Sequence, residues 1–177
     1  MRLRDLLRQI ANCYLSQDIK GLKQIVAVST YNLGTKRDKS YLLLGILSYA
    51  LGKVLQKESF FNTKDGYFYN TIKDYLIMTK HMSHENEIIK VCEKILALII
   101  EFENIDKKYA KSIIQKAKLK IGSTLYAQGF SLATASELSE ENQDDLMTYI
   151  GNTLFADRLK ESLDLKERLN RISELVE

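Results

Sequence analysis

Proline is absent from the 177 residues of the chain, and glycine occurs only eight times. Both residues mark the tight turns of β-sandwiches and β-barrels, so their scarcity disfavours those folds and favours helices. Only two cysteines occur, and their isolation excludes a disulfide framework or the paired spacing of a metal-binding knuckle. This use of cysteine is typical of a reducing compartment, and we therefore expect a cytoplasmic protein.

Long apolar runs are also lacking. The N-terminus, MRLRDLLRQI, carries charges where a signal peptide needs an apolar core, and no segment reaches the roughly 18 to 20 apolar residues that span a bilayer. With 45% hydrophobic residues and a net charge of only +3, the chain has the composition of a globular protein with a sizeable core. We expect neither export nor membrane insertion.

Apolar side chains recur at the three- and four-residue spacing of amphipathic helices along most of the chain. Residues 41–55, YLLLGILSYALGKVL, are apolar on all sides, and no charge lies between Lys39 and Lys53. A helix of this kind must be surrounded by other helices. The sequence therefore predicts an all-α protein of six to eight helices, with a bundle over residues 1–128 built around this segment.

Small residues form a stripe along the central segment. Gly45, Ser48 and Gly52 are three and four positions apart, so they share one face of a helix. Because small side chains let another helix approach closely, we expect all three to be buried at a helix contact.

Aromatic residues gather in the stretch SFFNTKDGYFYN, residues 59–70. Two aromatic runs flank Asp65-Gly66, a turn pair favoured in β-hairpins, but a lone hairpin is marginal in water, so a connection between helices is preferred. With lysines between them, the rings could stack single-stranded bases; the alternatives are that they fasten a loop to the core or form a protein interface.

The stretch GFSLATASELSEENQDDLMTYIG, residues 129–151, has the pattern of two short helices joined by a turn. The first helix is predicted over 131–138 and the second from 142 or 143 to 150. Apolar side chains on the two helices would face each other, as in a helix-turn-helix. These side chains are Leu132, Ala135, Leu138, Leu146, Met147 and Ile150.

The pattern S-L-x-x-A-x-E-L, a short turn and then D/E-L-M-x-Y-I-G resembles the helix-turn-helix segment of small prokaryotic antitoxin-like proteins and of uncharacterised archaeal helical proteins. The resemblance covers residues 129–151 and implies a helix-turn-helix there. It departs from the usual pattern at Glu140 and Glu141, where such turns carry glycine followed by an apolar residue.

The charge of this stretch disfavours DNA reading. Five acidic residues and no lysine or arginine lie between Ser131 and Gly151, whereas DNA affinity depends on cations that contact phosphates. We expect the pair to dock a protein, next to a terminal amphipathic helix in residues 156–177; the alternative is that it only caps the bundle. The candidate interface residues are Glu140, Glu141, Asp144 and Asp145, with the coiled-coil-like seam Leu165, Leu169, Ile172 and Val176.

A lysine-rich segment precedes the acidic one. Residues 131–177 carry 5 basic and 11 acidic side chains, net −6, which leaves 21 basic and 12 acidic, net +9, for residues 1–130. Such asymmetry is compatible with a nucleic-acid surface, with a solvated helix face, or with basic and acidic surfaces that meet. The candidate nucleic-acid contacts are Lys107, Lys108, Lys111, Lys116, Lys118 and Lys120, which we expect to be exposed.

Signatures of enzymes and metal sites are weak. His81, His84, Glu85 and Cys92 fall near one another, but Ile88 stands where a His-Glu-x-x-His motif needs its second histidine. We therefore predict no metal, no cofactor and no catalytic residue. The favoured function is a non-enzymatic interaction or regulatory protein that binds a protein partner or itself through residues 129–177. The alternatives are a DNA- or RNA-binding regulator that uses the lysine segment, and a hydrolase without a recognisable motif.

Overall fold

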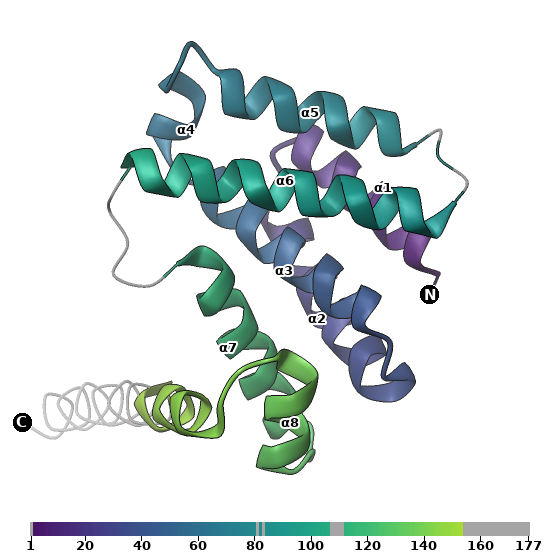
Figure 1. The fold of residues 1–177 in the computed structure, drawn as a ribbon, viewed down its shortest axis with the longest axis vertical. Helices are drawn as coiled ribbons and strands as arrows, with labels where there is room; N and C mark the ends of the chain where they lie inside the picture. The colour runs from purple at the N-terminus through teal and green to yellow at the C-terminus, as the bar shows by residue number, and fades with distance from the viewer. Residues whose placement is uncertain (1, 81, 83, 107–111, 154–177) are drawn as a thin grey trace, which may run out of the picture.

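The structure is a computed structural model that describes residues 2–80, 82, 84–106 and 112–153. Within these residues every regular element is a helix, and the helices pack as a bundle, which confirms the predicted all-α class (Figure 1). The elements are α1 (Leu3–Leu15), α2 (Ile19–Lys36), α3 (Lys39–Val54), α4 (Glu58–Asn62), α5 (Tyr67–Thr79), α6 (Glu85–Asp106), α7 (Ile113–Ala127) and α8 (Leu132–Ser139), followed by helical residues 143–153.

Helix α3 is the centre of the bundle, as its uncharged sequence predicts. It packs against α1, α2, α6, α7 and α8. Local signals fix its start: α2 ends where Arg37 takes a left-handed conformation at φ 53°, and the Asp38 carboxylate then accepts a hydrogen bond from the Ser40 amide at 2.9 Å. The connection between α2 and α3 is therefore tight, and the two helices lie against each other along most of their length.

The stripe of small residues on α3 is buried, as expected. A methyl group at Gly45 would meet Ile121 Cδ1 of α7 at 3.0 Å, so α7 approaches closely there. At Gly52 the nearest atom would be Leu22 Cβ at 3.7 Å, an ordinary van der Waals distance. The close contact that we predicted for all three residues is therefore tight at Gly45 and looser at Gly52.

Residues 59–70 form no hairpin: they contain the one-turn helix α4, a turn and the start of α5. Gly66 precedes α5 with φ 77°, a left-handed conformation that costs glycine little. Phe60 and Phe68 are fully buried, and both rings meet Phe102 of α6 edge to face, with centroids 5.2 and 5.6 Å apart. The prediction that these rings stack bases is therefore wrong for Phe60 and Phe68, which fasten the α4–α5 connection to the core.

A buried carboxylate links the end of α6 to the start of α7. Helix α6 continues to Asp106, and α7 starts at Ile113 after the Ser112 cap. The buried Glu103 carboxylate accepts a hydrogen bond from the Ile113 amide at 2.7 Å. A carboxylate at this position satisfies an unpaired amide of the first turn and favours the helix dipole, so Glu103 positions α7 relative to α6.

Candidate functional site

Two helices joined by a short turn follow α7, close to the predicted positions. Ser131 caps α8 by accepting a hydrogen bond from the Thr134 amide at 3.1 Å. Glu140 ends α8 in a left-handed conformation at φ 56°, and Asn142 Oδ1 accepts from the Asp145 amide at 2.9 Å at the start of helix 143–153. The turn is built from acidic and polar residues without glycine, because Glu140 itself takes the left-handed conformation.

The apolar side chains of this helix pair pack on α7. Ala135 and Leu146 are fully buried, and a methyl group at Gly122 of α7 would lie 2.6 Å from Ser139 Oγ and 3.0 Å from Leu146 Cδ1. The expectation that Met147 joins this face is wrong, because 47% of Met147 is exposed. It follows Leu146 by one position on the helix and therefore points away from α7.

Glu140 holds the helix pair to the bundle by two ion pairs. Its carboxylate lies 2.8 Å from Lys39 Nζ of α3 and 3.3 Å from Lys118 Nζ of α7. The hydrogen bond from Lys39, followed by Lys118, lowers the pKa of Glu140, and the same bond raises the pKa of Lys39. We call Glu140, Lys39 and Lys118 the Glu140 clasp.

The other interface candidates have varied surroundings. The Glu141 carbonyl accepts from the Ser136 hydroxyl, and Asp145 Oδ2 accepts from the Asn142 side-chain amide at 2.8 Å, so both contribute to the turn. Asp144 is exposed. Leu165, Leu169, Ile172 and Val176 lie outside the described residues.

The lysine segment is less uniform than its sequence predicts. Lys120 is exposed, Lys116 is half-buried, and the side chain of Lys118 is only 23% exposed because it reaches Glu140. The expectation that these lysines all remain exposed is therefore wrong for Lys116 and Lys118. Lys107, Lys108 and Lys111 lie outside the described residues.

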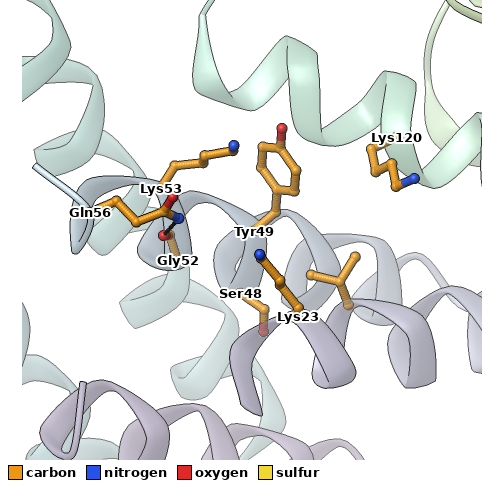
Figure 2. A pocket seen from close by; sticks show the side chains of 8 residues that line it. Lys23, Ser48, Tyr49, Gly52, Lys53, Gln56 and Lys120 are labelled. Carbon is orange, nitrogen blue, oxygen red and sulfur yellow. Dashed lines mark hydrogen bonds between the residues drawn. The ribbon is translucent and has the colours of Figure 1, made fainter. Parts of the chain in front are cut away.

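A pocket of about 230 Å³ lies between α2, α3 and α7, and its walls carry three lysines. Lys23 comes from α2, Lys53 from α3 and Lys120 from α7 (Figure 2). The rest of the lining is formed by Val26, Ser48, Tyr49, Gly52 and Gln56. We call this the lysine pocket.

The lysine pocket has an unbalanced charge. None of its eight lining residues is acidic. Lys53 Nζ lies 5.6 Å from the centroid of the Tyr49 ring, and among the described residues no ion pair involves Lys23 or Lys120. Three ammonium groups around one concavity attract anions, and phosphate is a usual partner of such lysines.

A second pocket, of about 300 Å³, lies between α3, α7 and helix 143–153. Tyr49 lines both pockets. The second pocket has one cation, Lys116, and one carboxylate, Asp145, and we call it the tyrosine pocket. Its remaining lining residues are Leu119, Thr148, Tyr149 and Asn152. Burial raises the pKa of Tyr149, which keeps its hydroxyl protonated and able to donate a hydrogen bond.

Sequence reasoning found Lys116 and Lys120 but missed the residues that the fold places beside them. Lys116 and Lys120 are four positions apart, so they lie on one face of α7, and that face borders both pockets. Lys23 and Lys53 are remote in sequence, and each has the pattern of an ordinary solvated lysine. Their proximity to Lys120 follows only from the packing of α2, α3 and α7, and no pattern in the sequence predicts it.

The histidine and cysteine candidates form no metal site in the part of the chain that the structure describes. His84 is exposed, whereas Cys92 is fully buried in the core, where burial raises its pKa to about 12. His81 lies outside that part. The described helices include none that is long and apolar enough to cross a membrane.

Comparison with known proteins returned no matching family model, no matching curated protein and no matching solved structure. The resemblance of residues 129–151 to antitoxin-like helix-turn-helix segments therefore remains a prediction.

Proposed function

We propose that the chain is a non-enzymatic regulatory binding protein whose lysine pocket takes a phosphate-bearing ligand. One observation carries this proposal: Lys23, Lys53 and Lys120 come from three helices to one concave site that no acidic side chain of the described residues lines. Like charges repel, and an anion bound among the three ammonium groups would offset that repulsion. The proposed anion site thus has lysines from α2, α3 and α7. The hypothesis from the sequence had taken its lysines from α7 and the segment before it alone.

The rest of the pocket favours phosphate attached to an organic group. Val26 and the ring of Tyr49 offer apolar surface beside the ammonium groups. A free inorganic anion makes no favourable contact with an apolar surface, whereas the sugar or base of a nucleotide can pack on it. Phosphate-bearing nucleotides and nucleic acids therefore match the pocket better than small inorganic ions do.

The test is calorimetric titration of the protein with inorganic pyrophosphate and with uridine monophosphate at low ionic strength. In the double variant Lys23→Gln/Lys120→Gln we expect roughly a 10- to 150-fold loss of affinity for both, which corresponds to the loss of about 1.5–3 kcal/mol of charged hydrogen bonds. The matched control is Lys90→Gln/Lys94→Gln on α6, which removes the same charge away from the pocket. Equal losses in the two double variants, or no binding by the unmodified protein, would refute the proposal.

The second function we propose is association through the C-terminal third, with a second copy or another protein. The residue to test is Met147, an apolar side chain of helix 143–153 that is 47% exposed among the described residues. Sedimentation at tens of micromolar tests the version with a second copy: a dimer that Met147→Lys dissociates is expected. A monomer throughout that range would contradict it.

A further inference from the structure

We infer that the ligand is single-stranded nucleic acid, which spans the lysine pocket and the tyrosine pocket across Tyr49. This inference rests on the proposed function and names the ligand of the same site. The observation behind it is that Tyr49 lines both pockets, so the two sites adjoin on α3.

The size of the pockets argues for a ligand that occupies both. The lysine pocket measures about 230 Å³ and the tyrosine pocket about 300 Å³. Sites for whole small molecules are usually about 300–1,000 Å³, so each pocket alone is at or below the lower end of that range. A chain of small units, each placed in its own pocket, fits this arrangement better than one compact ligand.

The chemistry of the two pockets differs in the way that successive parts of a nucleic acid differ. The lysine pocket, with three cations and no carboxylate, suits a phosphate. In the tyrosine pocket Lys116 is offset by Asp145, while Thr148, Tyr149 and Asn152 supply groups that donate and accept hydrogen bonds. Such a pocket disfavours a second phosphate and suits the edge of a base.

Tyr49 stands where stacking would occur. It is half-buried, and in the view of Figure 2 its ring lies between the side chains of Lys53 and Lys120, with Lys23 reaching up from α2. An aromatic ring flanked by cations is the usual platform of proteins that bind single strands, where bases stack and lysines follow the backbone. A duplex keeps its bases stacked on each other and cannot offer one to this ring.

The acidic helix pair would contribute to the same site. Glu137, Glu140, Glu141 and Asp144 do not line either pocket, and helix 143–153 presents Thr148 and Asn152 to the tyrosine pocket. The pair would then contact a base by hydrogen bonds while the cations of α2, α3 and α7 hold the backbone. This resolves the conflict between a helix-turn-helix-like shape and a surface that repels phosphate.

The experiment is fluorescence anisotropy with labelled oligouridine and oligodeoxythymidine of two, four and eight nucleotides, with unlabelled uridine monophosphate and pyrophosphate as competitors. We expect affinity to rise at least tenfold from the mononucleotide to the tetranucleotide and to fall as salt is raised. Comparison of the two series shows which sugar is preferred, and binding to either series supports the inference. A duplex of equal length should bind more weakly than the single strand.

Two variants isolate the tyrosine pocket. Tyr49→Leu should reduce affinity for the tetranucleotide about 5- to 150-fold, the range found when a stacking ring is removed, whereas Tyr31→Leu, at an exposed tyrosine of α2, should not. Asn152→Asp should lower the affinity for the tetranucleotide and leave the affinity for pyrophosphate unchanged. Asn86→Asp, at an exposed position, is its control. Thermal melting checks that each variant is folded.

The outcomes separate the two proposals. If pyrophosphate and the mononucleotide bind but longer strands bind no tighter, or a duplex binds better, single-stranded nucleic acid is wrong and the phosphate site stands. If Tyr49→Leu and Tyr31→Leu change the affinity for the tetranucleotide equally, the inference that one strand occupies both pockets is wrong. If no phosphate-bearing probe binds, both proposals fail.

Discussion

Lysines gather at two places around α3 and α7, and the two clusters differ in their acidic neighbours. In the Glu140 clasp, Lys39 and Lys118 share one carboxylate, at 2.8 and 3.3 Å. In the lysine pocket, Lys23, Lys53 and Lys120 surround a concavity that no carboxylate of the described residues lines. The first cluster is neutralised by Glu140, whereas the second has three cations and no such carboxylate, so its local field is positive.

The two clusters use different faces of the same helix. Lys118 and Lys120 are only two positions apart on α7, about 200° around its axis, so one reaches the helix pair and the other reaches α2 and α3. A run of lysines in the sequence therefore divides into Lys118, which pairs with Glu140, and Lys120, which lines the lysine pocket.

The largest change expected is for Gly122→Ala, which should separate the helix pair from α7. The added methyl group would lie 2.6 Å from Ser139 Oγ and 3.0 Å from Leu146 Cδ1, so the contact must open. Overpacking of this kind costs about 1–3 kcal/mol of unfolding free energy, measured by urea denaturation. Gly151→Ala is the control, because nothing lies within 4 Å of a methyl group there.

The same variant discriminates between the clusters. If the Glu140 clasp depends on docking of the helix pair, Gly122→Ala should remove the contribution of Glu140 to the free energy of unfolding. Pyrophosphate should still bind the lysine pocket of this variant. Unchanged unfolding by urea would mean that the helices do not pack as described.

Gly52→Ala should have the opposite sign. Its methyl group would meet Leu22 Cβ at 3.7 Å, which requires no rearrangement, and replacing glycine by alanine inside a helix gains up to about 1 kcal/mol. The methyl group also narrows the lysine pocket, so weaker ligand binding should accompany a higher melting temperature. Gly45→Val is the contrast, because Ile121 Cδ1 at 3.0 Å leaves no room, and a loss of stability is expected. Equal effects at both positions would refute the distinction.

These glycines also illustrate how far the sequence predicts the structure. The burial of Gly45, Ser48 and Gly52 followed from an uncharged helix that must be surrounded, and it is confirmed. How closely another helix approaches each residue did not follow, because it depends on crossing angles and on side chains from α2 and α7. The exposure of Met147 was missed for a related reason: which side of a short helix is covered depends on the neighbour that covers it.

The candidate site was predictable only in part. The run of lysines identified Lys116 and Lys120 but gave no means to tell them from Lys118, since all three have the pattern of a solvated helix face. Glu140 had the appearance of an external docking residue because its partner Lys39 is 101 positions away in the chain. Pairing over such a separation is set by the packing of α3, α7 and α8, and a pattern read along one helix cannot contain it.

The smallest effect is expected for Glu140→Gln, which removes the charge of the clasp and keeps the left-handed conformation. Lys39 and Glu140 are exposed and Lys118 is partly exposed, and ion pairs open to solvent contribute little, so only a small drop in melting temperature is expected at pH 7. The pKa of Glu140 is lowered from its ordinary 4.5, so the folded state favours the ionised carboxylate. The contribution is therefore complete above pH 4.5 and is lost as the pH falls through the lowered pKa.

Melting curves of the unmodified protein and of Glu140→Gln, recorded from pH 7 down to pH 3, should therefore converge at the acidic end. High salt at pH 7 should bring them together as well, because it screens exposed charges. Asp74→Asn, at an exposed position of α5, removes one charge without touching the clasp and corrects for the change in net charge. A difference between the two proteins that stays constant with pH and salt would mean that the Glu140 side chain acts by shape. The contrast between a neutralised and an open lysine cluster would then lose its electrostatic basis.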